Sequence, residues 1–156
     1  MAKEDVSDLL PFLEAFEPNI RAIALELRNR VWDQYAESNE LIYDGPAALA
    51  FGWSLSDRAA SVFLSIAIYN NKGVLFGFLK GAGLTDPLGL LEGKGKHYRY
   101  IRVDDLNAFP QDYAFDLLRQ SYENALRDAT NMNEGPSGGT IIKSASAKKR
   151  RPSKPV

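Results

Sequence analysis

The chain has 156 residues, of which 45% are apolar and 25% charged, so a single soluble domain with a substantial core is expected. Its net charge of −1 combines an acidic part, residues 1–130 at −6, with a basic part, residues 131–156 at +5. There is no cysteine, which excludes disulfides, thiolate catalysis and cysteine metal sites.

The N-terminal part predicts two helices. Apolar residues recur at helical spacing between Glu4 and Phe16, but Pro11 restricts this segment to a short helix that is kinked or begins near the proline. A second helix is expected from about Pro18 to Ala36, because apolar residues recur there in steps of three or four and the proline suits the first helical position.

Five segments then show the alternation or the β-rich composition of strands, at residues 41–43, 47–56, 61–69, 74–79 and 98–103. The second of them alternates bulky apolar residues with small ones, so one of its faces is bulky and the other is small. Asp44–Pro46 is a turn by composition, and residues 70–73 are expected to join the third and fourth strands into a β-hairpin.

A long glycine-rich loop with four leucines and several charges separates the last two strands. Loops of this length are uncommon in compact domains and are usually functional or disordered, and the leucines argue against disorder. We therefore expect a loop packed onto the domain with its charged groups held in place. Asp86-Pro87 predicts a single helical turn with Asp86 as its N-cap, and the alternative is a ligand role for Asp86.

The end of this loop and the strand after it are rich in glycine and cations. Two glycines allow the backbone to approach another group closely, and guanidinium groups suit carboxylate or phosphate. Alternation places Tyr98, Tyr100 and Arg102 on one face of the strand and Arg99 on the other. The alternative is a solvated strand whose arginines pair with nearby acids. The candidate ligand-binding residues are Asp86, Glu92, Gly93, Gly95, Lys96, Arg99 and Arg102.

Enzymatic motifs are not supported. Gly81-Ala82-Gly83 lacks the third glycine of a dinucleotide fingerprint, and residues 89–95 do not have the spacing of a phosphate-binding loop. The single histidine, His97, lies among lysines and arginines, which disfavour the protonated imidazole that a general base must form. No nucleophile–base pair is left, so we expect a protein that is not an enzyme.

Asn107 and Pro110 open a last helix, whose inward side is expected to be Ala114, Leu117, Leu118, Ser121, Ala125 and Ala129. Residues 131–156 show no periodicity and predict a disordered basic tail, in which Lys148–Arg151 is typical of a localisation or nucleic-acid patch. The domain, residues 1–130, is then α+β in two layers. Two N-terminal helices and one C-terminal helix cover one face of an antiparallel sheet of about five strands.

The loop and its strand resemble a motif of the YdhG-like family of small bacterial domains, through Gly81-Ala82, Leu84, Asp86-Pro87, Gly89-Leu90-Leu91-Glu92-Gly93, Gly95-Lys96, Arg99 and Arg102. Glu40, Tyr43-Asp44-Gly45 and Gly52 are similar to that pattern too, whereas Tyr100 stands where the close branch of the family has histidine. The resemblance covers roughly residues 18–129 and implies a fold similar to frataxin. One family branch is regarded as an intracellular iron chaperone, but no metal ligand carries over residue by residue.

These observations predict a binding protein for a small ligand or a protein partner, as a monomer or a homodimer. Ferrous iron is the ligand that the resemblance implies, with Glu40 and Asp44 as candidate carboxylates. The alternative is an anion or acidic-partner module at residues 93–102.

No apolar run approaches the roughly 18 residues that span a bilayer, and the charged start is unlike a signal peptide, so we expect a cytoplasmic protein without a membrane partner. Nucleic-acid affinity is expected only in the basic tail.

Overall fold

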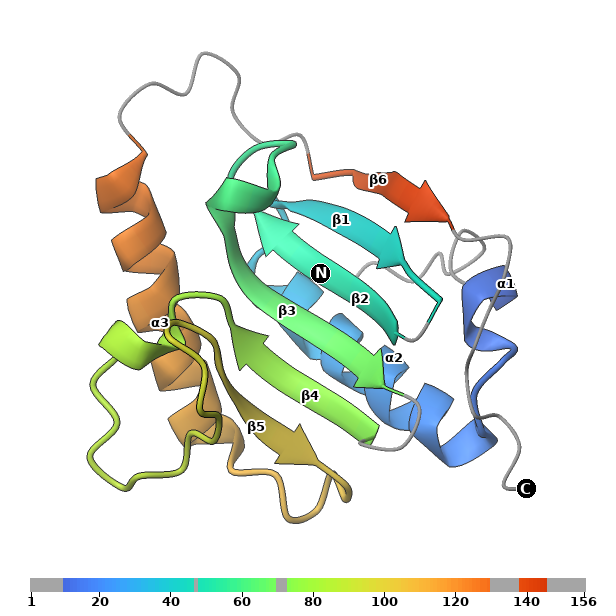
Figure 1. Ribbon diagram of the computed structural model, residues 1–156, viewed down its shortest axis with the longest axis horizontal. Helices are drawn as coiled ribbons and strands as arrows, with labels where there is room; N and C mark the ends of the chain where they lie inside the picture. Colours follow the sequence, from blue (N-terminus) through green and yellow to red (C-terminus); the bar gives the residue numbers. More distant parts are fainter. Residues whose placement is uncertain (1–9, 47, 70–72, 130–137, 146–156) are drawn as a thin grey trace.

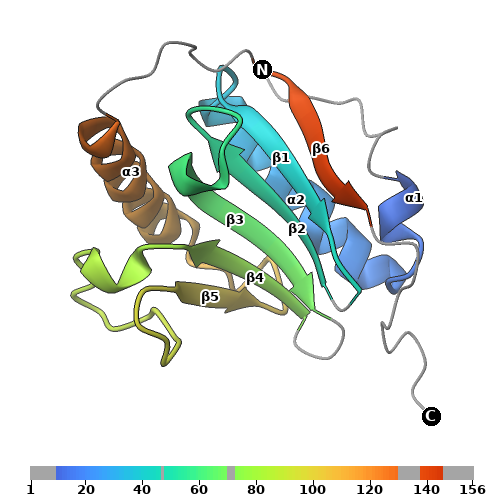
Figure 2. The same cartoon turned by 45° about the horizontal axis from the view of Figure 1, so that its top comes forward.

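The computed structural model describes residues 10–46, 48–69, 73–129 and 138–145. They form an α+β fold of two layers, in which a six-stranded sheet carries α2 (Pro18–Gln34) and α3 (Gln111–Asp128) on one face (Figure 1; Figure 2). The strands are β1 (Asn39–Asp44), β2 (Ala48–Ser54), β3 (Val62–Tyr69), β4 (Gly73–Phe78), β5 (Arg99–Val103) and β6 (Thr140–Ala145). The predicted fold class is confirmed.

The strand order is β5-β4-β3-β2-β1-β6, and every neighbouring pair is antiparallel except β1 and β6, which are parallel. The prediction of disorder from residue 131 is therefore wrong for residues 140–145, and the sheet has six strands rather than five. Ile141 and Ile142 are too brief an apolar pair to signal a strand. Their segment is held instead by the backbone groups that β1 presents at its edge. The Lys148–Arg151 cluster lies outside the described residues.

The helices form where the spacing predicted them. The short α1 (Leu10–Leu13) contains Pro11, and α2 begins at Pro18, as predicted. The inward side predicted for α3 is confirmed, because Ala114, Leu117 and Leu118 are buried and the three later positions are half-buried. Within the described part of the chain, none of the helices is long and apolar enough to cross a membrane.

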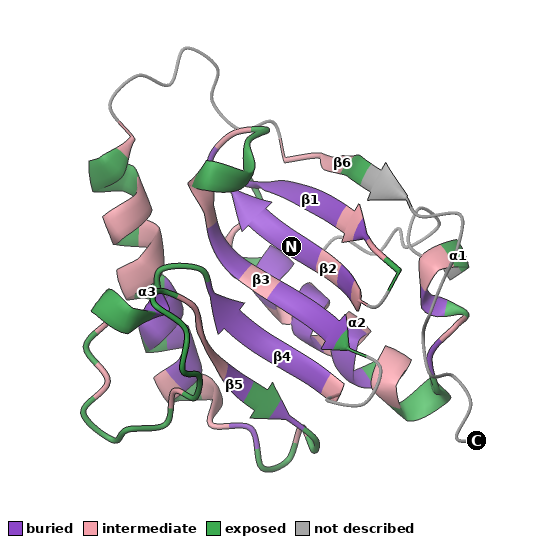
Figure 3. Cartoon of the chain, viewed as in Figure 1, coloured by how far each residue is buried: buried purple, intermediate pink, exposed green. Residues whose placement is uncertain are grey.

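The core lies between the helices and one face of the sheet (Figure 3). Alternate residues of each central strand point into it, as Leu49, Phe51 and Trp53 do on β2. The hairpin predicted from residues 61–79 is confirmed by the pairing of β3 with β4, although residues 70–72 of its turn lie outside the described residues. Both α2 and α3 lie on one face of the sheet, so the second face is free of them (Figure 1; Figure 2), and the candidate site is built on this second face.

Candidate functional site

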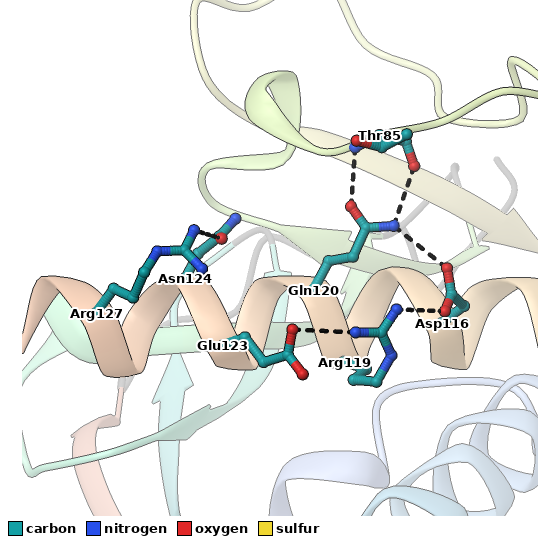
Figure 4. A network of polar contacts seen from close by, with 7 residues as sticks. All are labelled: Thr85, Asp116, Arg119, Gln120, Glu123, Asn124 and Arg127. Atoms are coloured by element: carbon teal, nitrogen blue, oxygen red, sulfur yellow. Dashed lines mark hydrogen bonds and ion pairs between the residues drawn. The ribbon is translucent and has the colours of Figure 1, made fainter.

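The loop between β4 and β5 lies along α3 and is tied to it. Gln120 donates from Nε2 to the carbonyl oxygen of Thr85 at 3.1 Å and accepts the N–H of Thr85 at 2.9 Å (Figure 4). The same Nε2 reaches Asp116 at 3.3 Å, which orients the amide. Two of the loop leucines, Leu84 and Leu91, pack against the core, whereas Leu88 and Leu90 are exposed. The predicted packing of the loop is confirmed, though only half of its leucines contribute.

Asp86 holds the turn of this loop. Its carboxylate accepts the N–H groups of Leu90 and Leu91, both at 3.0 Å, and the hydroxyl of Tyr113. Burial raises the pKa of this carboxyl, but the hydrogen bonds outweigh burial and hold the pKa below its usual value. Residues 86–89 form a β-turn, in which Gly89 N–H bonds to the carbonyl oxygen of Asp86 at 3.0 Å, and not the predicted helical turn. The side chain is thus occupied within the loop.

Residues 92–100 form a hairpin, because Glu92 and Tyr100 exchange backbone hydrogen bonds of 2.8 and 3.0 Å. Gly93 has φ +128°, and a Cβ there would lie 3.0 Å from the carbonyl oxygen of Tyr98. A Cβ on Gly95 would meet nothing within 4 Å. The backbone therefore requires glycine at position 93 and tolerates other residues at position 95.

The predicted cations Lys96, Arg99 and Arg102 do not converge on one site. Lys96 is exposed in the hairpin. Arg99 donates from Nη1 to the carbonyl oxygens of Gly95 and Tyr98 at 2.6 and 2.7 Å, so part of its guanidinium holds the hairpin. Arg102 lies on the other face of β5, with its Nε 3.3 Å from Asp104 Oδ1. This placement matches the alternative reading of a solvated strand more closely than a single anion site.

The two candidate metal ligands lie in the interior. Glu40 is 0% exposed and accepts two hydrogen bonds from Arg28 and one from Thr140, while Asp44 is 1% exposed. Among the residues that the structure describes, no group of three or more His, Cys, Asp or Glu side chains could hold a metal ion. Both carboxylate oxygens of Glu40 are therefore engaged in an ion pair, which leaves this residue poorly suited to iron.

The face of the sheet opposite the helices has a floor of small residues. Two register rows cross it. One holds Tyr43, Ala50, Ala67, Leu75 and Arg102, and the next holds Leu41, Gly52, Ser65, Gly77 and Tyr100. Small side chains on the central strands thus lie between Tyr43 of β1 and Tyr100 and Arg102 of β5. We call the resulting hollow, of about 380 Å³, the tyrosine groove, with main lining residues Tyr43, Ala50, Gly52, Ser65, Ala67 and Tyr98.

Tyr98 closes one side of the tyrosine groove. Its ring stacks on Tyr100, with centroids 5.7 Å apart and an interplanar angle of 29°, and it lies over Gly77. A Cβ on Gly77 would overlap the phenol ring, so glycine is needed there for close approach. Burial, together with Tyr69 and Tyr100, raises the pKa of Tyr98. Its hydroxyl is therefore protonated at neutral pH and serves as a donor.

The hydroxyl groups of Tyr43 and Tyr98 are buried and have no hydrogen-bond partner among the described residues. Burial raises the pKa of Tyr43 as well, so both hydroxyls are neutral donors. A phenolic hydroxyl inside a protein usually finds a partner. Tyr43 and Tyr98 both line one hollow, so two hydroxyls that lack acceptors belong to the walls of the same site.

A second hollow, of about 470 Å³, adjoins the tyrosine groove and shares Ala59, Val62 and Leu79 with it. Lys80 and His97 line this second hollow, next to the 3₁₀ turn Gly81–Gly83. The two hollows therefore lie next to each other on the surface, between Tyr43 and the hairpin of residues 92–100.

The sequence contained one indication of this site, the small face of the strand at residues 47–56, but the candidate ligand-binding residues did not include it. This small face forms a groove only because β3 places Ser65 and Ala67 beside Gly52 and Ala50. Comparisons of this chain with protein-family models, with curated proteins and with solved structures find no match.

Proposed function

We propose that this domain is a non-enzymatic binding protein and that the tyrosine groove holds its ligand. One observation carries this proposal: Tyr43 and Tyr98 line the same hollow, and the buried hydroxyl of each has no hydrogen-bond partner among the described residues. A buried polar group without a partner costs about 1–3 kcal/mol of folding free energy. A ligand with acceptor oxygens would supply the missing partners of both tyrosines.

The size and lining of the groove support a small, flat and mostly apolar ligand. Its volume of about 380 Å³ lies within the range of roughly 300–1,000 Å³ that ligand sites occupy. The small side chains of Ala50 and Ala67 form part of the floor, the side chain of Val62 lies against Gly52, and Tyr43 and Tyr98 offer aromatic contacts. No acidic side chain and no nucleophile–base pair is found among these lining residues, which favours binding over catalysis.

The YdhG-like resemblance, the iron-chaperone role and the cytoplasmic location stay predictions, as does the choice between monomer and homodimer. The placement of Glu40 and Asp44 in the interior gives the iron role no support. The anion module at residues 93–102 is likewise not favoured, because Arg99 and Arg102 lie on opposite faces of β5.

The proposal is tested by titrating the full chain into N-phenyl-1-naphthylamine, an uncharged aromatic probe that fluoresces when it leaves water. We expect saturable one-to-one binding to the wild type. Ala50→Phe places a ring in the groove on an outward strand position that tolerates aromatic side chains, and should abolish binding.

Ala22→Phe is the matched control, because Ala22 is exposed on α2, in the layer opposite the groove. It should bind the probe as the wild type does, and circular dichroism should show that both variants fold. Absence of binding to the wild type, or equal binding to the Ala50→Phe variant, would refute the proposal. Self-association that Ala50→Phe disrupts would instead identify the groove as an interface between copies of the chain and would also overturn it.

A further inference from the structure

We call the hollow that adjoins the tyrosine groove the Lys80–His97 end, after the lysine and the histidine that line it. Beyond Leu79, which both hollows share, the lining continues with Lys80 and His97. The hairpin is fixed at this point because Ala82 N–H bonds to the carbonyl oxygen of His97 at 2.9 Å. The position of this end relative to the groove is thus set by backbone contacts.

The charge at this end contrasts with the rest of the domain. Residues 1–130 carry a net charge of −6, yet no aspartate or glutamate is among the residues that line either hollow. Two adjoining hollows that have no acidic lining residue, on a domain of negative net charge, are complementary to a negatively charged ligand group.

Lys80 is accessible to such a group. Its Nζ lies 3.4 Å from Asp128 Oδ2, with the side chains 71% and 61% exposed. Ion pairs this exposed are weak and are screened by solvent and salt, so an anion in the hollow can compete with Asp128. His97 is exposed beside it and adds a second donor.

We infer that the ligand is a free amphipathic organic acid, whose flat apolar body lies in the tyrosine groove and whose anionic group lies at the Lys80–His97 end. This inference rests on the proposed function, since it assumes that the groove is the ligand site. The hydroxyls of Tyr43 and Tyr98 donate to oxygen atoms of the ligand body, and Lys80 selects the charged end.

The test compares two probes with the same aromatic rings, 8-anilinonaphthalene-1-sulfonate, which is an anion, and the uncharged N-phenyl-1-naphthylamine. In the full chain at low ionic strength, Lys80→Met should lower the affinity for the anionic probe about two- to fivefold, the range of an exposed ion pair, and leave the affinity for the uncharged probe unchanged. Asp128→Asn should raise the affinity for the anionic probe, because it removes the competing carboxylate. Added salt should lower the affinity for the anionic probe only.

Lys94→Met is the matched control, because Lys94 is exposed in the hairpin that carries His97 but lines neither hollow. An equal loss of affinity for the anionic probe in the Lys80→Met and Lys94→Met variants would indicate a non-specific electrostatic attraction and would overturn the inference. No loss of affinity in either variant would overturn it too. Co-sedimentation of the chain with phosphatidylglycerol vesicles would indicate that the anionic group belongs to a lipid surface, and would overturn the inference that the ligand is a free organic acid. Failure of the proposed function is distinct from these outcomes, because it would appear as absence of uncharged-probe binding.

Discussion

Arg28 on α2 holds Glu40 on β1 through two hydrogen bonds, from Nε to Oε2 at 2.7 Å and from Nη2 to Oε1 at 2.8 Å. The two side chains are 1% and 0% exposed, and Thr140 of β6 donates to the same Oε1 at 2.8 Å. One buried ion pair thus joins the helical layer, the sheet and its last strand.

Glu40→Ala should lower the free energy of unfolding by about 3–5 kcal/mol, because it leaves the Arg28 guanidinium buried without its counter-charge. The measurement is urea unfolding followed by circular dichroism. The double variant Arg28→Met, Glu40→Leu should recover most of this loss, since apolar residues of similar volume often replace a buried pair without cost. A double variant as unstable as Glu40→Ala would show that the pair itself stabilises the fold.

Tyr98→Phe should raise the free energy of unfolding by about 1 kcal/mol, because it removes a buried hydroxyl without a partner and keeps the ring that stacks on Tyr100. Tyr113→Phe is the opposite case, since its hydroxyl donates to Asp86 and accepts the N–H of Leu88 at 3.0 Å. That variant should lower the melting temperature. Destabilisation by Tyr98→Phe would indicate that its hydroxyl has a partner in solution.

Asp86→Asn should lower the melting temperature at neutral pH by weakening the hydrogen bonds that hold the loop. The pKa of Asp86 is lower in the folded state than in the unfolded chain, so its contribution is complete above the unfolded pKa of about 4 and is lost as pH falls through the folded value. The difference between wild type and variant should therefore shrink below about pH 4 in thermal unfolding. A difference independent of pH would show that the charge of Asp86 has no part in it.

Gly93→Ala should destabilise the domain by about 1 kcal/mol or more, because φ +128° is strained for any residue with a Cβ and the new atom meets the carbonyl oxygen of Tyr98. Gly95→Ala, two residues away, should be neutral or slightly stabilising, since its Cβ enters open space and the unfolded chain loses freedom. Chemical unfolding of the pair is the measurement, and equal effects would contradict the hairpin geometry.

Deletion of residues 131–156 should lower the melting temperature by several degrees. It removes β6 from the edge of β1, together with the Thr140 hydroxyl that donates to Glu40. The disordered tail predicted from the sequence would imply almost no change, so this measurement discriminates directly between the two expectations. Deletion of residues 146–156 keeps β6 and serves as the control, with a melting temperature close to that of the wild type.

Much of the fold could be predicted because it depends on local periodicity. The change from a period near 3.6 to a period of 2 after Ala36 separates α2 from the sheet, and Pro18 marks where α2 begins. The candidate site was predicted less well, since Asp86 and Arg99 satisfy groups within the loop. Charged residues in a loop indicate that something is bound there but not whether it is a ligand or the loop's own backbone.

The sequence by itself determined the class of fold, the helices, five of the strands and the packing of the loop, because each depends on which side chains recur at a given spacing. Only the tertiary structure decided that residues 140–145 pair with β1, that Glu40 meets Arg28, and that Gly52 and Ser65 lie side by side in a hollow that Tyr43 and Tyr98 also line. These relationships depend on strand order and register, which bring together residues far apart in the chain. The physical reason is that alternation assigns each residue to a face, whereas the neighbours on that face are set by the hydrogen-bonded alignment of the strands.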